Sequence, residues 1–299
     1  MRAYFCILLG AVLVVGLSAA PALGETYTFT GAIDCGWNVK GNWNPTSGYP
    51  GSGDTAIIPA SKTVCVGEDE KSPGNSDCGE LVVDDTTAIV DIYDQGGTLT
   101  IESAAEINGE IRFRGQPGEF GPALHFGGDI AIEGTGIIRG DNASGLVLGR
   151  ITGAAGDVVT IPSGFTIKGS ISIHAELVNN GLVLVDDEND TLQLLTNLKS
   201  GGSTGKWKCT DGTLFVGFCT VSGSAKWVLK GDVQTSELHF ASTGTTDSLS
   251  GDFDVTGGTF RIDTPLCTSG DITVKAGANN PKVIVIRNTT VTFNNPSCP

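Results

Sequence analysis

The stretch GDFDVTGGTFRIDTPLCTSGDITVKAGANNPKVIVIRNTTVTF, residues 251–293, decides the fold because it repeats one pattern. Gly251-Asp252-Phe253-Asp254-Val255 returns, at a step of 19, as Gly270-Asp271-Ile272-Thr273-Val274, and Thr289–Phe293 follows after a second such step. Gly231-Asp232-Val233 precedes the first copy by nearly the same step. Gly-Asp pairs favour turns, and apolar residues at every second position are typical of a strand with one face toward a core. Repeats of about 20 residues without helical spacing predict a β-solenoid, in which each turn of the chain stacks on the last.

The rest of the chain supports the same fold class. Its 43 glycines, its single Met and a charged content of 17% suit many short strands joined by tight turns better than helices. We therefore expect an all-β chain that forms a right-handed parallel β-helix. Apolar pairs two residues apart are expected to fill its core, for example Ile130 with Ile132, Leu182 with Leu184, and Leu192 with Leu194. The pattern loosens around residues 206–221, where Thr210-Asp211-Gly212-Thr213 reads as a hairpin turn. We expect either a protruding flap or a change in coil shape there.

Residues 1–24 have the pattern of a secretory signal peptide. Arg2 supplies the positive start, Phe5–Ala20 forms a short apolar run, and Ala22-Leu23-Gly24 is a small-x-small cleavage site. The run is short for a membrane anchor, and no second apolar segment follows it. We therefore expect a protein that is secreted or held at the cell surface, with no membrane span once the signal is removed.

The charge balance excludes one class of partner. The 18 basic and 33 acidic residues give a formal net charge of −15. We expect no nucleic-acid partner for so acidic a chain, because binding to phosphates relies on Lys and Arg. An acidic chain also offers ligands for divalent cations.

Seven cysteines follow residue 24, and in an exported chain they favour disulfides over a metal site. Proximity in sequence favours the pairs Cys65–Cys78, Cys209–Cys219 and Cys267–Cys298. The last of these pairs would hold the C-terminal end against the final coil. Cys35 is then left as a free thiol or as a bridge to another molecule. Spacing does not fix connectivity, so a Cys35–Cys65 bond with a free Cys78 is the competing arrangement.

The segment 25–60 differs from the solenoid body expected over residues 61–299, and it carries a resemblance. The matching positions are Trp37, Asn42-Trp43, Pro50-Gly51-x-Gly53-Asp54, Ile57-Ile58-Pro59 and Val64, followed by Gly79–Val83 and Gly97–Ile101. This order resembles the opening of exported bacterial β-helix proteins and is similar to the start of the G8 domain. The resemblance covers roughly residues 27–113 and implies a parallel β-helix with an N-terminal cap, but it brings no catalytic residue.

Trp37 and Trp43 have two interpretations. A cap over the first coil needs bulky apolar side chains, because an open β edge is an aggregation hazard that native chains cover. The alternative is a sugar-stacking platform, for which exposed indole rings are suited. We favour the cap.

The densest acidic cluster is Asp186-Asp187-Glu188-Asn189-Asp190. Five oxygen-bearing side chains in one loop are candidate ligands for calcium, although the loop lacks the glycine and the distal glutamate of the common calcium loop. Acidic turn residues between strands are the ordinary alternative. No other cofactor is expected.

Recognisable catalytic motifs are missing. His125, His174 and His239 each follow an inward apolar residue, so we expect them on the outer walls, too far apart in sequence to form a metal triad. The chain has no Gly-His-Gly of the kind found in polygalacturonases and no Arg-x-Pro-x-x-Arg of the kind found in pectate lyases. We therefore expect a structural or adhesive surface protein, carbohydrate-binding in character, whose partner is an extracellular polysaccharide or a second copy of itself. The alternatives are a polysaccharide lyase or glycoside hydrolase, and a self-assembling fibre subunit.

Overall fold

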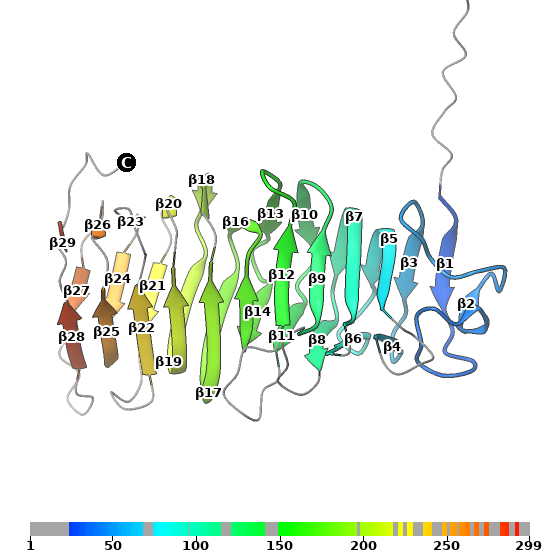
Figure 1. The fold of residues 1–299 in the computed structure, drawn as a ribbon, viewed down its shortest axis with the longest axis horizontal. Coiled ribbons are helices and arrows are strands. Elements are labelled where there is room, and N and C mark those ends of the chain that lie inside the picture. The colour runs from blue at the N-terminus through cyan, green and yellow to red at the C-terminus, as the bar shows by residue number, and fades with distance from the viewer. Residues whose placement is uncertain are drawn as a thin grey trace, which may run out of the picture.

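The computed structural model shows an elongated β-solenoid, confirming the predicted fold class (Figure 1). It describes residues 24–67, 74–94, 96–114, 121–140, 149–195, 198–217, 221–223, 226–229, 236–240, 247–249, 252–255, 257–263, 266–268, 272–274, 282–286 and 291–292. The signal-like residues 1–23 lie outside this set. Strands of successive coils pair in parallel and stack along the long axis of the molecule. β1 lies near one end, and β28 and β29 lie at the other.

The described strands form three stacks. The first stack consists of β3 (Thr55–Ile58), the second half of β5 (Asn75–Val83), the second half of β7 (Thr98–Ile107), β10 (Ile130–Glu133), β13 (Val158–Ile161), β16 (Glu176–Asn179), β18 (Leu198–Ser203), β20 (Val221–Gly223), β23 (Asp247–Leu249), β26 (Leu266–Thr268) and β29 (Val291–Thr292).

The second stack consists of β4 (Thr63–Val66), β6 (Ile89–Tyr93), β8 (Glu110–Arg114), β11 (Ile137–Gly140), β14 (Thr166–Gly169), the first part of β17 (Leu182–Leu194), the first part of β19 (Lys206–Val216), β21 (Lys226–Leu229), β24 (Asp252–Val255) and β27 (Ile272–Val274). The third stack consists of the first parts of β5 and β7, β9 (Ala123–Phe126), β12 (Gly149–Gly153), β15 (Ile171–Ile173), the last parts of β17 and β19, β22 (Ser236–Phe240), β25 (Gly258–Ile262) and β28 (Lys282–Ile286).

The register tests the repeat that predicted the fold. Phe253 pairs with Ile272 and Val255 with Val274, so the step of 19 between these copies is confirmed. The copy at Thr289–Phe293 was wrongly placed, and the copy at Gly231–Val233 lies outside the described residues. Val291 pairs with Leu266 in the first stack, and the strand that precedes Phe253 in its own stack is β21, through a longer coil that pairs Trp227 with Phe253. The coils differ in length because the corners between their strands contain different numbers of residues. One period therefore cannot fit them all.

The expected hairpin at Thr210–Thr213 is wrong. Residues 206–209 of β19 pair in the second stack, and residues 212–216 pair in the third, so the strand turns a corner without reversing direction. Gly212 sits at this corner with φ +79°. A Cβ there would lie 2.3 Å from the carbonyl oxygen of Asp187, so the position requires glycine for close stacking as well as for its backbone angle.

The inward side chains form one continuous apolar core, as the alternation predicted. Ile130, Ile132, Leu192 and Leu194 are all buried. Leu182 and Leu184 are an exception, because their partly exposed side chains alternate with buried Val183 and Val185. The prediction that this leucine pair fills the core is wrong, and its two side chains belong to an outer wall.

The first coil is preceded by β1 (Thr26–Phe29), the short 3-10 helix η1 (Lys40–Asn42) and β2 (Trp43–Asn44). β1 pairs in parallel with β3 and antiparallel with β2. Trp37 and Trp43 are 0% exposed and meet edge to face, with ring centroids 5.0 Å apart. Trp43 Nε1 also donates to the backbone oxygen of Trp37 at 2.6 Å. Both rings therefore belong to the core at this end of the solenoid.

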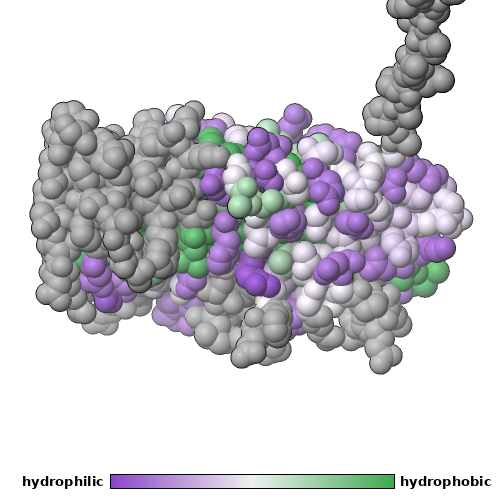
Figure 2. Space-filling model, turned by 45° about the horizontal axis from the view of Figure 1, so that its top comes forward, coloured by the Kyte–Doolittle hydropathy of each residue, from purple (hydrophilic) through white to green (hydrophobic). Residues whose placement is uncertain are grey.

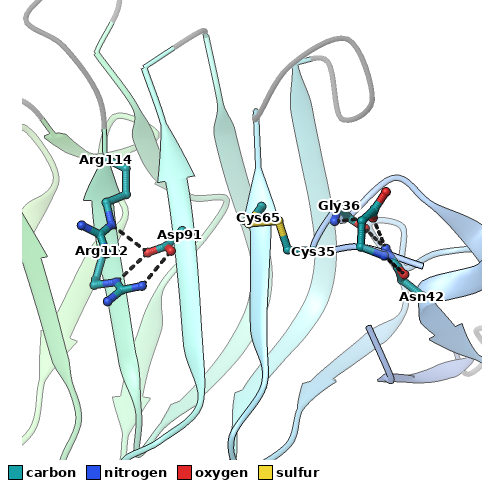
Figure 3. Close-up of a disulfide and its surroundings, with 8 residues drawn as sticks. Cys35, Gly36, Asn42, Cys65, Asp91, Arg112 and Arg114 are labelled. Atoms are coloured by element: carbon teal, nitrogen blue, oxygen red, sulfur yellow. Dashed lines mark hydrogen bonds and ion pairs between the residues drawn. A yellow bond between two sulfur atoms is a disulfide. The ribbon is translucent and has the colours of Figure 1, made fainter. Parts of the chain in front are cut away.

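Asn42 holds the loop that precedes β2 (Figure 3). Its side chain is fully buried and makes four hydrogen bonds. Oδ1 accepts from the backbone nitrogens of Ile33 and Asp34, at 2.9 and 3.1 Å. Nδ2 donates to Asp34 Oδ1 and to the Gly36 oxygen, at 2.6 and 2.9 Å. One amide side chain thus satisfies several polar groups of the loop.

Asn42→Ala is expected to lower the free energy of unfolding by about 2 kcal/mol, because it leaves backbone donors and an acceptor of the loop without their partner. Urea denaturation of the signal-free chain measures the change. Asn38→Ala, a partly exposed asparagine of the same loop, is the matched control and should change stability by less than about 0.5 kcal/mol. Equal effects of the two substitutions would contradict the role assigned to Asn42.

The disulfide in the structure joins Cys35 to Cys65, which is the competing arrangement of the sequence prediction (Figure 3). The favoured Cys65–Cys78 pair is therefore wrong, and so is a free Cys35. Cys78 and Cys209 are free and buried, which also excludes the Cys209–Cys219 pair. Burial raises the pKa of both thiols, to about 12 for Cys209. Cys219 and Cys298 lie outside the described residues, so the predicted Cys267–Cys298 pair stays a prediction.

A search of the described residues for membrane-crossing helices finds no candidate of sufficient length and hydropathy. On the face shown in Figure 2, hydrophilic residues spread over the described surface and hydrophobic residues form only small separate patches. The side chains available to a ligand are therefore sought on the outer walls of the three stacks.

Candidate functional site: a basic wall on an acidic solenoid

The outer wall of the second stack carries a row of cations, which we call the basic wall. Strand register places Arg112 of β8 beside Arg139 of β11, and Arg139 beside Lys168 of β14. On β17 the next register position is taken by Leu184, and beyond it Lys208 of β19 follows. Lys206 of β19 pairs with Lys226 of β21 two residues away on the same wall. Neighbouring strands lie about 4.8 Å apart, so cations far apart in sequence become close neighbours along the rod.

Carboxylates accompany the cations of β8. Asp91 of β6 is only 4% exposed. Its carboxylate accepts hydrogen bonds from Arg112 Nε at 2.6 Å and from Arg112 Nη2 at 2.7 Å. Arg114 Nε lies 3.3 Å from the same carboxylate (Figure 3). The bidentate geometry suits the guanidinium fork and holds Arg112 in a fixed orientation on the wall.

The next two cations are paired as well. Arg139 Nε lies 3.0 Å from Glu110 Oε1, and Lys168 Nζ lies 2.9 Å from Asp186 Oδ2. These pairs are partly exposed, so each contributes little to stability and leaves the cation accessible to a competing anion.

The remaining cations of the basic wall are different. Within the described part of the chain, neither Lys206 nor Lys208 nor Lys226 forms an ion pair. Lys206 and Lys226 are exposed and directly opposite each other in register. Like charges in this position repel. The basic wall thus has a neutralised half and an unneutralised half.

The other walls do not share this character. On the first stack, Glu80, Glu106 and Glu133 line a shallow hollow of about 100 Å³ over Ala104 and Ala131. Glu80 accepts from Thr55 Oγ1 at 3.0 Å, and Glu106 accepts from Asn108 Nδ2 at 3.0 Å. Among the described residues, this hollow is lined by carboxylates without a cation, whereas the carboxylates of the basic wall are paired with its arginines and with Lys168.

The third stack carries all three histidines on its strands or at their ends, although they are distant in sequence. His125 Nδ1 lies 2.9 Å from Thr152 Oγ1, and His174 Nε2 lies 3.2 Å from Ser172 Oγ. Desolvation lowers the pKa of His174, and nearby Arg150 adds to this effect. The prediction of wall positions is correct.

His239 belongs to the most closely connected polar group of the third stack. Its Nε2 lies 3.1 Å from Asp263 Oδ2, and its Nδ1 lies 3.9 Å from Glu237 Oε1. Arg261 donates from Nε to Asp263 Oδ2 at 2.6 Å, and this bond is the main reason that the pKa of Asp263 is lowered. Both ring nitrogens of His239 face carboxylates, so neither is open to act as a general base on a substrate.

The predicted calcium ligands do not converge. Asp186 pairs with Lys168, Asp187 Oδ1 accepts from the backbone nitrogen of Asn189 at 3.0 Å, and Asp190 turns inward to Ser170. Glu188 is exposed. Among the described residues no three His, Cys, Asp or Glu side chains are grouped to hold a metal ion, so the geometry does not favour the predicted site.

Asp190 is instead a buried carboxyl group of the wall corner. It is 7% exposed and accepts from Ser170 Oγ at 3.0 Å. Desolvation raises its pKa from an ordinary 3.8 to about 6. Folding therefore takes up a proton between these two values. This contribution to stability is complete below about pH 4 and declines as the pH rises to about 6.

Asp190→Asn is expected to remove this decline and to raise the free energy of unfolding at pH 7 by about 1 to 2 kcal/mol. The amide oxygen can still accept from Ser170, and no charge is buried. Urea denaturation at pH 4 and pH 7 measures the difference. Asp187→Asn, an exposed neighbour, should leave the difference between the two pH values as in the unmodified chain. A D190N variant with an unchanged pH dependence would contradict the assignment.

Two features of the walls escaped the sequence analysis. The sugar-stacking alternative for Trp37 and Trp43 is wrong because both rings are buried. Partly exposed aromatic side chains lie elsewhere on the walls, and Phe215 of β19 is one of them. The alternation of Leu214 and Val216 around it was the available sign. The basic wall had no such sign, because its cations meet only through coil lengths that the sequence does not reveal.

Comparison of the chain with protein-family models, with curated proteins and with solved structures finds no match. The resemblance to the G8 opening therefore stays a prediction. The function is therefore inferred from the fold and from the side chains of its outer walls.

Proposed function

We propose that this protein is an exported structural or adhesive surface protein that binds an extracellular polysaccharide along its long walls. The observation that supports the proposal most is the basic wall, a row of cations in register on a chain with a net charge of −15. A linear polymer lying along the rod can contact cations from several successive coils, because neighbouring strands are about 4.8 Å apart.

Three features agree with an exported, polysaccharide-binding protein. The signal-like residues 1–24 and the resemblance of the opening to exported β-helix proteins support an extracellular location. A Cys35–Cys65 disulfide is compatible with an oxidising compartment. The parallel stacks supply a stiff body that holds its wall residues in fixed positions.

The test measures binding of the signal-free chain to immobilised polysaccharides, neutral and acidic, by surface plasmon resonance. Saturable binding to at least one of them supports the proposal, and binding to none contradicts it. The same samples are assayed for new reducing ends and for unsaturated products. Turnover above that of buffer would instead establish the alternative, a glycoside hydrolase or polysaccharide lyase on a β-helix.

Self-assembly is the remaining alternative. End-to-end stacking of solenoids is a route to fibres, because strand edges at the two ends can pair with those of another molecule. Size-exclusion chromatography with and without reductant measures it, and a monomer under both conditions would exclude the fibre.

A further inference from the structure

The lysines of β19 and β21 are the feature that the fold itself does not explain. Lys206 and Lys226 lie directly opposite each other on neighbouring parallel strands, and Lys208 lies two residues along the same face. Cross-strand pairs of like charge destabilise a sheet. The chain has nearly twice as many acids as bases, so a shortage of carboxylates is not the cause.

The rest of the same wall gives the contrast. Arg112, Arg139 and Lys168 each have a carboxylate at 3.0 Å or closer. Salt bridges of this kind occupy a cation within the protein, whereas a free ammonium is available to a ligand. Lysine is a compact, strongly hydrated point charge that binds carboxylates and sulfates alike.

The surroundings of the lysines define the ligand further. Register places Leu182 beside Lys206 and Leu184 beside Lys208, and both leucines are partly exposed. On the other side, Asp252 takes the register position next to Lys226. The ammonium groups are thus bordered by an aliphatic strip toward β17 and by an acidic register position toward β24.

An acidic polysaccharide matches this combination. Its sugar rings present apolar C–H faces to an aliphatic strip, and its carboxylate or sulfate groups carry the charge that the ammonium groups attract. A simple inorganic anion uses the charge alone. Apolar contact and charge complementarity from neighbouring positions favour the glycan.

We infer that Lys206, Lys208 and Lys226, with Leu182 and Leu184, form the site at which this protein binds an acidic glycan chain. The inference rests on the proposed binding function and names its ligand class and its contact residues. The glycan lies across β17, β19 and β21, and its anionic groups contact the lysines.

The test uses the signal-free chain and a matched pair of variants. Lys206→Gln with Lys226→Gln removes two charges from the site. Lys40→Gln with Arg150→Gln removes two charges from exposed positions outside the basic wall. Binding to polygalacturonate, chondroitin sulfate and neutral dextran is measured at 50 mM and 300 mM NaCl. The first variant should bind both acidic glycans about tenfold more weakly at low salt, and the control should bind within about twofold of the unmodified chain.

A third variant separates a glycan from a simple anion. Leu184→Ser should weaken binding to polygalacturonate while leaving binding to inorganic polyphosphate unchanged, because only the glycan uses the aliphatic strip. Equal losses for both ligands would overturn the glycan assignment. Thermal unfolding of each variant shows that it is folded, and loss of the Lys206–Lys226 repulsion should leave the melting temperature equal or higher.

The remaining outcomes separate this inference from the proposed function. If the unmodified chain binds acidic glycans and the lysine variant binds like its control, the site is wrong and the proposed function stands. Binding to dextran alone overturns the ligand class. No binding to any glycan overturns both. Equal affinity for single-stranded DNA and for polygalacturonate would show a general attraction to polyanions and overturn the glycan assignment.

Discussion

Trp207→Ala is expected to lower the free energy of unfolding by about 4 kcal/mol, the cost of emptying a large buried site in a packed core. The Trp207 ring is 0% exposed and stacks on Trp227, with centroids 5.2 Å apart and an interplanar angle of 17°. Trp227 meets Phe240 at 5.6 Å, and Phe240 meets Phe260 at 5.7 Å. The aromatic rings run from coil to coil, so one deletion leaves a cavity between neighbouring turns.

Chemical denaturation with fluorescence detection measures the effect, and Trp207→Phe is the control. The indole Nε1 of Trp207 is buried and has no hydrogen-bond partner in the described structure. Phenylalanine removes this unsatisfied donor, but its smaller ring fills less of the buried site. We expect a change within about 1 kcal/mol for W207F, because the two effects oppose each other. A cost below about 1 kcal/mol for W207A would mean that this part of the solenoid is not a packed core.

Removal of the Cys35–Cys65 disulfide is expected to cost about 3.5 kcal/mol, because a cross-link of this span reduces the entropy of the unfolded chain by roughly this amount. The bond closes a loop with a sequence separation of 30. It also ties the segment before β2 to β4, next to the Gly36–Cys65 bridge. The double variant Cys35→Ser with Cys65→Ser should therefore unfold at a lower denaturant concentration than the unmodified chain.

Reduction supplies the control for this prediction. With a thiol reductant present, the unmodified chain should lose the same stability, and the double variant should not change. Peptide mapping under non-reducing conditions should recover a fragment that links Cys35 to Cys65. A fragment that links Cys65 to Cys78 would contradict the structure, in which Cys78 is free and buried.

Leu182-Val183-Leu184-Val185 shows why the sequence does not place every side chain. All four residues are apolar, so either alternate pair suits a core. The structure buries Val183 and Val185 by pairing Val183 with Trp207, which is itself inside. The face of a strand is decided by its partners whenever both phases of the alternation are apolar.

The disulfide shows a second limit. Cys65 and Cys78 are near in sequence, but Cys65 lies in the second stack and Cys78 in the third. Cys35, at a sequence separation of 30, is brought to Cys65 by the path of the first loop. Neighbours in a solenoid are one coil apart, so proximity along the chain is a poor guide to contact.

The sequence by itself determined the fold class, because a two-residue alternation broken by glycine turns leaves few other ways to bury the apolar residues. It also determined that the histidines face outward and that residues 252–255 and 272–274 stack with a step of 19. Tertiary structure alone decided the basic wall. Arg112, Arg139 and Lys168 align only because the two intervening coils, which differ in length, each return the chain to the same wall. Those lengths depend on corners that have no fixed period, and no local pattern in the sequence specifies them.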